Sequence, residues 1–483
     1  MNTIFKIGFM KKSLFLLIFM TLLTGIKCYA QTNDTIIFSK LGSFNFTWTY
    51  SGYTPLFDRL KRPFIYLATK ELGLVIFDIS NTSNPLPVDT IPVSSLGNLK
   101  ATGITQDSIF LYISLGDFQS TQNAGLAIYD ISNPENPIFL DSWTDNEFNK
   151  GSSSVICKGN YAYLSAMEKG VIILDVSDKH NIKYVSKIIP DLNFGNKKFT
   201  YHSRGLFLEG DTLLVADDNG GLRLIDVTNK KNPIEIGKHL NSRIDSTGAV
   251  YCNHVYQIGN YAYCAMDFCG IETVDVSDPS SIISIAWLNP WNCINQPFPF
   301  GSWNGSDGHC NEIAYSDLQN ILFFSGGDTE IIAVSIDNPY KPKIIGTWGL
   351  PGDKVGSWGI DISENLAAVA NVHTLGFPFV SNTGGLQLLS WRHISRVDQL
   401  EQLNTFQIFP NPSSTKAILQ SQNYLHNSTI VINDTFGSTS FCFKNISGTS
   451  FEIPCDSLPV GIYIIKIIED NKLSGFCKLI IQK

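Results

Sequence analysis

Short apolar runs separated by turn residues fill the chain after residue 30, and helical patterns are nearly absent there. In one representative stretch, residues 153–158, 161–166, 171–176 and 182–188 each predict a β-strand, because β-branched and aromatic residues in runs of this length favour strands. Gly159-Asn160 joins the first two strands, and this pair suits the positive φ angles of a two-residue hairpin. The pattern predicts an all-β chain built from four-stranded units.

The same pattern recurs along the chain. Each copy has a glycine, an apolar strand that ends in aspartate, and a turn rich in Ser, Asn and Pro. Side-chain oxygens in such turns cap backbone N–H groups, so we interpret the repeated aspartates as structural. The copies begin at Gly73, Gly125, Gly170, Gly221 and Gly270, with two weaker copies from Glu330 and Gly385. Spacings of about 50 residues between these copies predict a seven-bladed β-propeller.

The seventh unit has no fourth strand of its own before the repeat stops. Residues 35–42, with the sequence TIIFSKLG, resemble that missing strand. We expect this N-terminal strand to close the last blade, because closure removes the open sheet edges that invite aggregation. The predicted propeller therefore spans residues 31–395.

The N-terminus has the pattern of a signal peptide. Lys11 and Lys12 precede an apolar stretch, and Ala30 provides a small residue before a cut at Gln31, so residues 1–30 are expected to be removed. No later segment approaches the roughly 20 apolar residues that a membrane helix requires, so no membrane span is expected. The protein is predicted to be secreted or held on the outer cell surface, after export through the periplasm.

From residue 404 the composition changes, after a short linker at 396–403. Residues 404–483 predict a small C-terminal β-sandwich, with strands around FQIFPNPSS, IVINDTFGS, LPVGIYIIKI and the final CKLIIQK. This segment contains Pro410, Asn411, Pro412, Gly437, Gly461, Tyr463, Lys478 and Lys483, the positions that carry the resemblance to a sorting domain given below.

Two resemblances follow from these strings. The strand-and-turn repeats resemble LVIVD repeats, a β-propeller repeat family of secreted bacterial proteins, over roughly residues 35–395. The C-terminal segment resembles the type A sorting domain of the type IX secretion system. That resemblance implies that the tail engages the type IX machinery, passes the outer membrane and is removed, with release or surface attachment as alternatives. Neither resemblance indicates a ligand.

The net charge argues against one class of binding partner, and the cysteines suggest disulfide bonds. A formal net charge of −8 argues against nucleic acid, whose binding depends on clustered Lys and Arg. An exported chain can form disulfides. Strand register across the Gly259-Asn260 hairpin favours a Cys252–Cys269 pair, and Cys293–Cys310 is the second expected pair.

Two sets of residues are candidates for a binding site on the face where second-to-third-strand and blade-to-blade connections meet. Elaborated loops on a rigid scaffold often carry function. Aromatic residues there suit stacking on a glycan or contact with a protein; they are Trp291, Phe298, Phe300, Trp303, Trp358 and Phe377. Acids near the ends of second strands predict an alternative cation site, with calcium as the candidate ion; they are Glu71, Glu168, Asp218, Asp267 and Asp328.

The chain contains no nucleophile elbow, HExxH, Walker loop or dinucleotide motif. We therefore expect a secreted or cell-surface binding or scaffold propeller without catalytic activity. The alternative is a metal-dependent hydrolase or lyase with its site at the propeller mouth.

Overall fold

The computed structural model describes residues 35–47, 50–118, 121–194, 200–245, 251–293, 308–329, 331–350, 352–375, 380–394, 406–434, 439–469 and 472–483. The predicted signal peptide and the predicted linker lie outside these residues. Chain contacts divide the described residues into one unit over Thr35–His393 and a second that begins at Ile394 and ends at Lys483.

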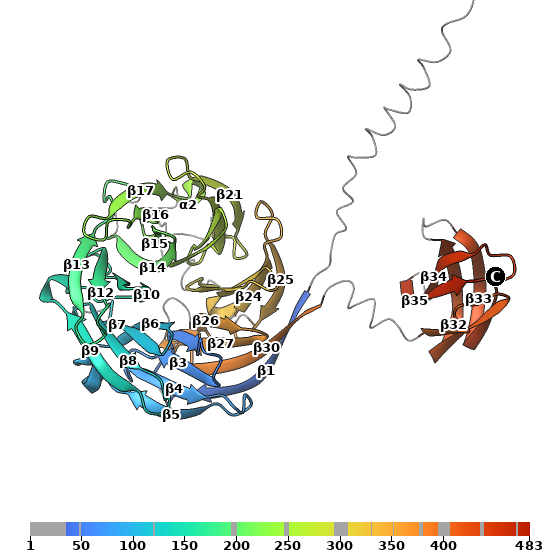
Figure 1. Cartoon of the computed structure of the whole chain (residues 1–483), viewed down its shortest axis with the longest axis horizontal. Coiled ribbons are helices and arrows are strands. Elements are labelled where there is room, and N and C mark those ends of the chain that lie inside the picture. Colours follow the sequence, from blue (N-terminus) through green and yellow to red (C-terminus); the bar gives the residue numbers. More distant parts are fainter. Residues whose placement is uncertain are drawn as a thin grey trace, which may run out of the picture. The chain divides into compact units, whose positions relative to one another are not determined.

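The first unit contains seven four-stranded antiparallel sheets in its described residues. Figure 1 shows them arranged around a common centre. The innermost strands are β2 (Thr54–Phe57), β6 (Ala101–Asp107), β10 (Ser154–Lys158), β14 (His202–Glu209), β18 (His254–Ile258), β22 (Ile313–Ser316) and β26 (Ser357–Ser363).

The remaining strands follow outward. The second strands are β3 (Phe64–Ala68), β7 (Phe110–Leu115), β11 (Tyr161–Ser165), β15 (Thr212–Asp218), β19 (Tyr261–Ala265), β23 (Ile321–Ser325) and β27 (Leu366–Asn371). The third are β4 (Leu74–Asp78), β8 (Gly125–Asp130), β12 (Val171–Asp175), β16 (Gly221–Asp226), β20 (Ile271–Asp275), β24 (Ile331–Ser335) and β30 (Gly385–Ile394). The outermost are β5 (Leu86–Ile91), β9 (Ile138–Thr144), β13 (Lys183–Ile188), β17 (Ile234–His239), β21 (Ile283–Leu288), β25 (Lys343–Trp348) and β1 (Thr35–Asn45).

Other elements in the described part of this unit are short. They are the one-turn helix α2 (Ser242–Asp245), 3-10 turns at Val93–Leu96, Asn146–Phe148 and Gly327–Thr329, and the two-residue strands β28 (Thr374–Leu375) and β29 (Val380–Ser381). The expected all-β fold class is confirmed.

Six of the sheets use four strands in sequence order, and the seventh has the order β1-β30-β27-β26. The first strand of the unit therefore supplies the outer edge of the last sheet. Phe38 on β1 packs edge-on against Phe323 of the neighbouring sheet, with ring centroids 6.2 Å apart.

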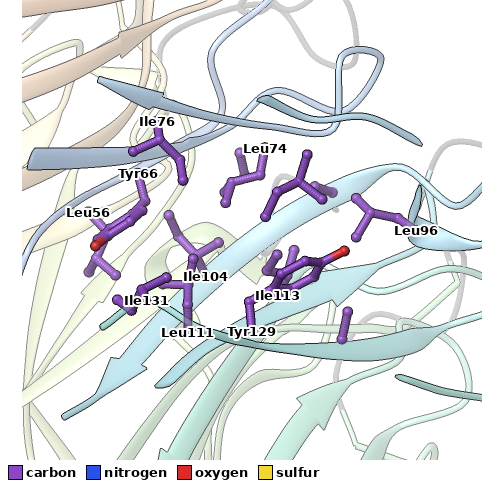
Figure 2. Packing of buried hydrophobic residues seen from close by; sticks show 14 of the residues in the cluster. Leu56, Tyr66, Leu74, Ile76, Leu96, Ile104, Leu111, Ile113, Tyr129 and Ile131 are labelled. Carbon is purple, nitrogen blue, oxygen red and sulfur yellow. The ribbon is translucent and has the colours of Figure 1, made fainter. Parts of the chain in front are cut away.

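Apolar residues fill each interface between neighbouring sheets. Figure 2 shows one interface, where Leu56, Tyr66 and Ile76 of the first sheet interdigitate with residues of the second sheet. Comparable clusters join every neighbouring pair, and one of them packs β27 and β30 against β3 and β4. The sheets thus form a closed ring in which each hydrophobic face is covered.

The repeated aspartates have the expected structural role. In five sheets the carboxylate accepts a hydrogen bond from the backbone N–H two residues later, at distances of 2.7–3.0 Å. This bond fixes the turn between the third and fourth strands. Donors on the turn lower the pKa of Asp130, Asp175 and Asp226 below its ordinary value.

The second unit contains β31 (Phe406–Phe409), β32 (Lys416–Asp434), β33 (Thr439–Pro454), β34 (Gly461–Glu469) and β35 (Lys472–Ile481). The long strand β32 pairs with β31 through its first half, with β34 through its second half and with β33 along its length. Irregularities in the β32–β33 register between Gln420 and Ile430 bend the strand. Ala417 and Ile432, from its two halves, therefore share one core.

Candidate functional site

The inner strands of all seven sheets surround one central channel of about 460 Å³. The channel runs from the first residues of several of these strands toward their C-terminal ends. At its inner end it adjoins a much smaller pocket of about 40 Å³, which lies where the inner strands begin. We call this smaller space the mouth pocket. It is bounded by Tyr53, Thr102, Phe118, Ser153, Arg204, Asn253, Asn311, Glu312 and Trp358, among others.

A hydrogen-bonded network crosses three sheets at the mouth pocket. Arg204 Nη1 lies 3.2 Å from Asp218 Oδ2 and donates to Asn253 Oδ1 at 2.6 Å. Asn253 in turn donates to Asn311 Oδ1 at 3.2 Å. Asn311 Nδ2 lies 2.6 Å from His309 Nδ1. Residues at the beginning of successive inner strands thus hold one another in place.

Asp267, at the His309 end of this network, is also paired. His309 Nε2 lies 2.7 Å from Asp267 Oδ1, and both side chains are buried. Backbone pairing adds a second link, because the Cys310 N–H donates to the Asp267 carbonyl at 2.8 Å. The turn between the second and third strands of one sheet is therefore fixed to the first strand of the next.

Aromatic rings and cations alternate on the other side of the mouth pocket. Lys70 Nζ lies 4.1 Å from the centre of the Tyr53 ring and 4.0 Å from that of Phe118. It also lies 3.4 Å from Asp117, and burial lowers the pKa of Lys70 to about 8. The Arg204 guanidinium approaches the same Phe118 ring at 5.4 Å. Such contacts favour a rigid, partly desolvated surface.

Trp358 completes this surface. Its ring stacks on His309 and meets Tyr53 edge-on, with centroid distances of 5.4 Å in both cases. The Trp358 side chain is half-buried, and it borders the mouth pocket. It therefore presents an aromatic surface beside the amide and guanidinium groups of the network.

Glu312 lies between the mouth pocket and the channel. Thr54 donates to its Oε1 at 2.9 Å and the Ile360 N–H donates to its Oε2 at 3.1 Å. Gly359 leaves room for the carboxyl group, since a Cβ atom there would lie 2.8 Å from Oε2. Desolvation outweighs the two hydrogen bonds and raises the pKa of Glu312 to about 8.

The raised pKa of Glu312 predicts a pH-dependent stability. Between the ordinary pKa of 4.5 and about 8, the folded protein retains a proton that the unfolded chain has lost. The free energy of unfolding should therefore fall as the pH rises through this range and level off above it. In Glu312→Gln this component is absent, so its urea midpoint should fall less between about pH 5 and about pH 8 than the wild-type midpoint does. Glu364→Gln on the exposed surface is the control, and equal pH dependence in all three proteins would contradict the assignment.

The five acids predicted as a cation site do not converge. Glu71 pairs with Lys100 at 3.2 Å, Glu168 with Lys150 at 3.4 Å, and Asp328 accepts the Gly352 N–H at 2.7 Å. Asp218 and Asp267 belong to the network described above. Among the described residues, no group of three His, Cys, Asp or Glu side chains is arranged to hold a metal ion. Calcium binding stays a prediction.

The predicted aromatic residues have different positions. Trp358 borders the mouth pocket, whereas Trp291 packs edge-on against Phe324 at 6.2 Å. Phe298, Phe300, Trp303 and Phe377 lie outside the described residues. Binding by these six residues stays a prediction.

Sequence reasoning missed most of the residues at the mouth pocket. Tyr53, Arg204, Asn253 and Asn311 stand at or just before the first residues of inner strands, where the strings of different repeats share no common residue type. Aligning the repeats on their inner strands, instead of on the repeated aspartate, brings these positions into register.

The expected disulfide pairings are wrong. The structure pairs Cys269 with Cys293, with Cα atoms 5.3 Å apart, and leaves Cys252 and Cys310 as buried free thiols. Cys252 instead contacts Cys264, which raises the pKa of the Cys252 thiol together with its burial. Cys252 and Cys269 do lie in the same hydrophobic cluster, as the hairpin register predicted. The loop after β21, however, brings Cys293 to Cys269, and these two residues form the disulfide.

Several of the predicted sorting residues contact β35 or the loop before β34. Asn411 donates to the Lys478 carbonyl at 2.7 Å and accepts the Ile480 N–H at 2.8 Å, so it ties the segment after β31 to β35. It stands between Pro410 and Pro412. Gly461 pairs with Ile481. The Tyr463 hydroxyl donates to the Pro459 carbonyl and Lys483 Nζ to the Asp456 carbonyl. Gly437 lies outside the described residues.

The fold defines a repeat protein of the propeller class that carries a separate C-terminal β-domain. Residues 61–90, 118–145, 151–187, 202–240 and 252–286 match the LVIVD repeat. Residues 407–482 match the secretion system C-terminal sorting domain. Both resemblances seen in the sequence are confirmed. The sorting domain indicates export through the type IX system to the cell surface or the medium.

No curated protein matches the chain. Among solved structures, the chain is similar to the computationally designed Ika8 protein, with 8% identity over 73% of this chain and 99% of that one, at a TM-score of 0.44. It is also similar to a chain of the Mitotic Checkpoint Complex, with 9% identity over 73% of this chain and 93% of that one, at a TM-score of 0.48. No helix in the described part of the chain is long and apolar enough to cross a membrane.

Proposed function

We propose that this chain is an exported binding propeller without catalytic activity, and that the face around the mouth pocket binds an extracellular glycan. The observation that carries the proposal is the composition of the mouth pocket. Residues at the beginning of all seven inner strands meet there, and they combine aromatic rings with amide, hydroxyl and guanidinium groups. Aromatic surface beside a few fixed polar groups is typical of sites that recognise hydroxylated ligands by stacking and hydrogen bonding.

Most ionisable groups around the mouth pocket are held in pairs, which favours recognition over catalysis, and Glu312 is held by two hydrogen bonds. Asp218 is paired with Arg204, Asp267 with His309 and Asp117 with Lys70. Side chains held in fixed pairs of this kind orient neighbouring donors and acceptors. Proton transfer would instead need an acid or base directed at a reacting group.

Trp358 provides the test. The probe is an array of immobilised polysaccharides, consisting of cellulose, xylan, mannan, chitin and mucin O-glycans, and the protein is the purified full chain. Trp358→Ala should weaken binding to the preferred polysaccharide about tenfold, since loss of an aromatic contact costs about 1.4 kcal/mol. The readout is the concentration for half-maximal binding.

Phe139→Ala is the matched control, because Phe139 is an exposed aromatic residue on the outer strand β9. It should bind as the wild type does. If no polysaccharide binds, or if Trp358→Ala and Phe139→Ala bind equally well, glycan recognition at the mouth pocket is wrong.

A further inference from the structure

The channel adjoining the mouth pocket is a cavity enclosed by the inner strands of all seven sheets. Its volume of about 460 Å³ falls in the range of small-molecule sites. The lining begins where the inner strands begin, near Thr54 and Glu312, and reaches Arg59 in the turn after β2. A ligand would therefore enter from the ends of the inner strands, opposite to the mouth pocket.

One wall of the channel is aromatic. Phe207, Tyr256 and Tyr315 come from β14, β18 and β22, which belong to consecutive sheets. The Phe207 and Tyr256 rings are 4.7 Å apart, and the Tyr256 and Tyr315 rings are 5.7 Å apart. Because each ring contacts the next, the three rings form a continuous arc on the channel wall. All three side chains are half-buried.

The wall contributed by the other inner strands is largely aliphatic. Ile104, Ile156 and Ile362 line it, together with Thr105. A flat ligand with an apolar face would thus find stacking surface on one side and aliphatic contacts on the other. This arrangement favours a ring-shaped ligand over an extended flexible one.

The charges in the channel cancel. The two terminal guanidinium nitrogens of Arg59, Nη1 and Nη2, each lie 3.0 Å from a carboxylate oxygen of Asp361. The Asp361 carboxylate also accepts the Phe57 N–H at 2.7 Å. Burial lowers the pKa of His254 to about 4 and raises that of Glu312 to about 8, so both are largely neutral at neutral pH. An ionic ligand would lose its hydration without gaining an opposite charge. The channel therefore favours a neutral ligand.

Polar groups gather at the inner end of the channel. His254 Nδ1 is buried and has no hydrogen-bond partner among the described residues. Thr54 also lines this end, and its hydroxyl contacts Glu312 and the Thr102 carbonyl. A buried nitrogen without a partner is unfavourable, and a ligand hydroxyl that donates to His254 Nδ1 would satisfy it.

We propose that the channel is a second binding site, which takes a neutral hydroxylated ring compound of mono- or disaccharide size through the end opposite to the mouth pocket. The ring stacks on the arc of Phe207, Tyr256 and Tyr315, and its hydroxyl groups reach His254, Thr54 and Glu312. This inference does not depend on glycan binding at the mouth pocket, because the aromatic and aliphatic walls that carry it do not line that pocket, although Thr54, His254 and Glu312 border both spaces.

Isothermal titration calorimetry of the full chain tests the proposal. The probes are glucose, galactose, N-acetylglucosamine, cellobiose, maltose and lactose. At least one should bind to the wild type, and Thr105→Trp, which fills the channel, should abolish that binding. Tyr315→Ala, which removes one ring of the arc, should weaken it about tenfold. Thermal melting of each variant verifies that it is folded, and Tyr315→Ala keeps the test valid if Thr105→Trp does not fold.

Trp358→Ala separates the two sites. If the saccharide binds in the channel, Trp358→Ala leaves its affinity unchanged while the two channel variants reduce it. If Trp358→Ala alone weakens binding, the saccharide occupies the mouth pocket, and the channel proposal is overturned while the proposed function stands. If none of the six saccharides binds, or if a folded Thr105→Trp binds as the wild type does, the channel is not a saccharide site.

Discussion

Replacing Phe38 by alanine is expected to lower the free energy of unfolding of the propeller unit by about 3–5 kcal/mol. Phe38 lies on β1, is 8% exposed and packs among residues of two neighbouring sheets. Its removal leaves a cavity against Phe323 and weakens the strand that pairs with the outer edge of β30. Urea denaturation followed by near-ultraviolet circular dichroism measures the effect.

Ile37→Ala is the control for this substitution. Ile37 is the preceding residue on β1 and is 43% exposed, because alternate residues of a strand face opposite sides. Its replacement should cost less than about 1 kcal/mol. If both variants unfold at the same urea concentration, β1 does not contribute to closing the ring through its buried face.

Arg223→Ala is expected to have an effect of similar size, about 3–5 kcal/mol. Arg223 is fully buried at a position of the repeat where other sheets place apolar residues such as Val75 and Ala127. Its guanidinium lies 2.9 Å from Glu235 and donates to the carbonyl groups of Asp191, Gly220 and Phe194. Truncation leaves a carboxylate and three acceptors without their donor, and the loss should appear as a lower urea midpoint.

Lys238→Ala provides the comparison. Lys238 approaches the same loop and pairs with Asp191 at 2.5 Å, but its side chain is 39% exposed. A surface pair of this kind contributes about 0–1 kcal/mol, because water and salt screen it. Equal losses for Arg223→Ala and Lys238→Ala would show that burial of the guanidinium does not determine the effect.

The architecture could be predicted from sequence because it repeats. Five copies bring their own turn signal, such as the hydrogen bond between Asp78 and the Ser80 N–H, and three have a hairpin glycine, at Gly159, Gly210 and Gly259. The same turn and strand patterns therefore predict the same sheet several times, and an error in one copy does not change the predicted architecture. The weak copy at Glu330 still forms a four-stranded sheet, because neighbouring sheets cover it on both faces.

The site was harder to predict because it does not repeat. Arg204 and Asn311 occupy equivalent places in different sheets, yet each is specific to its own position in the ring. Their proximity depends on ring geometry, which brings together residues separated by about 50 positions in sequence. The acids were found by their turn positions, but the cations that neutralise them, such as Lys100 for Glu71, come from the next sheet. The Cys269–Cys293 pair was missed because the path of the loop after β21, which brings Cys293 to Cys269, does not follow from the repeat pattern.

The order of strands in the last sheet also determines how folding can proceed. Six sheets consist of consecutive strands, so each can assemble from a short stretch of chain. The seventh joins residues far apart, and the Ser390 hydroxyl lies within 3.5 Å of the Ser39 carbonyl across 351 positions. Pairing over such a separation is slow, because loop closure must precede the contacts that reward it. Among the described strands of the propeller unit, the first to be synthesised is therefore the last to be paired, and until then β1 and β30 both present edges to which other chains can add.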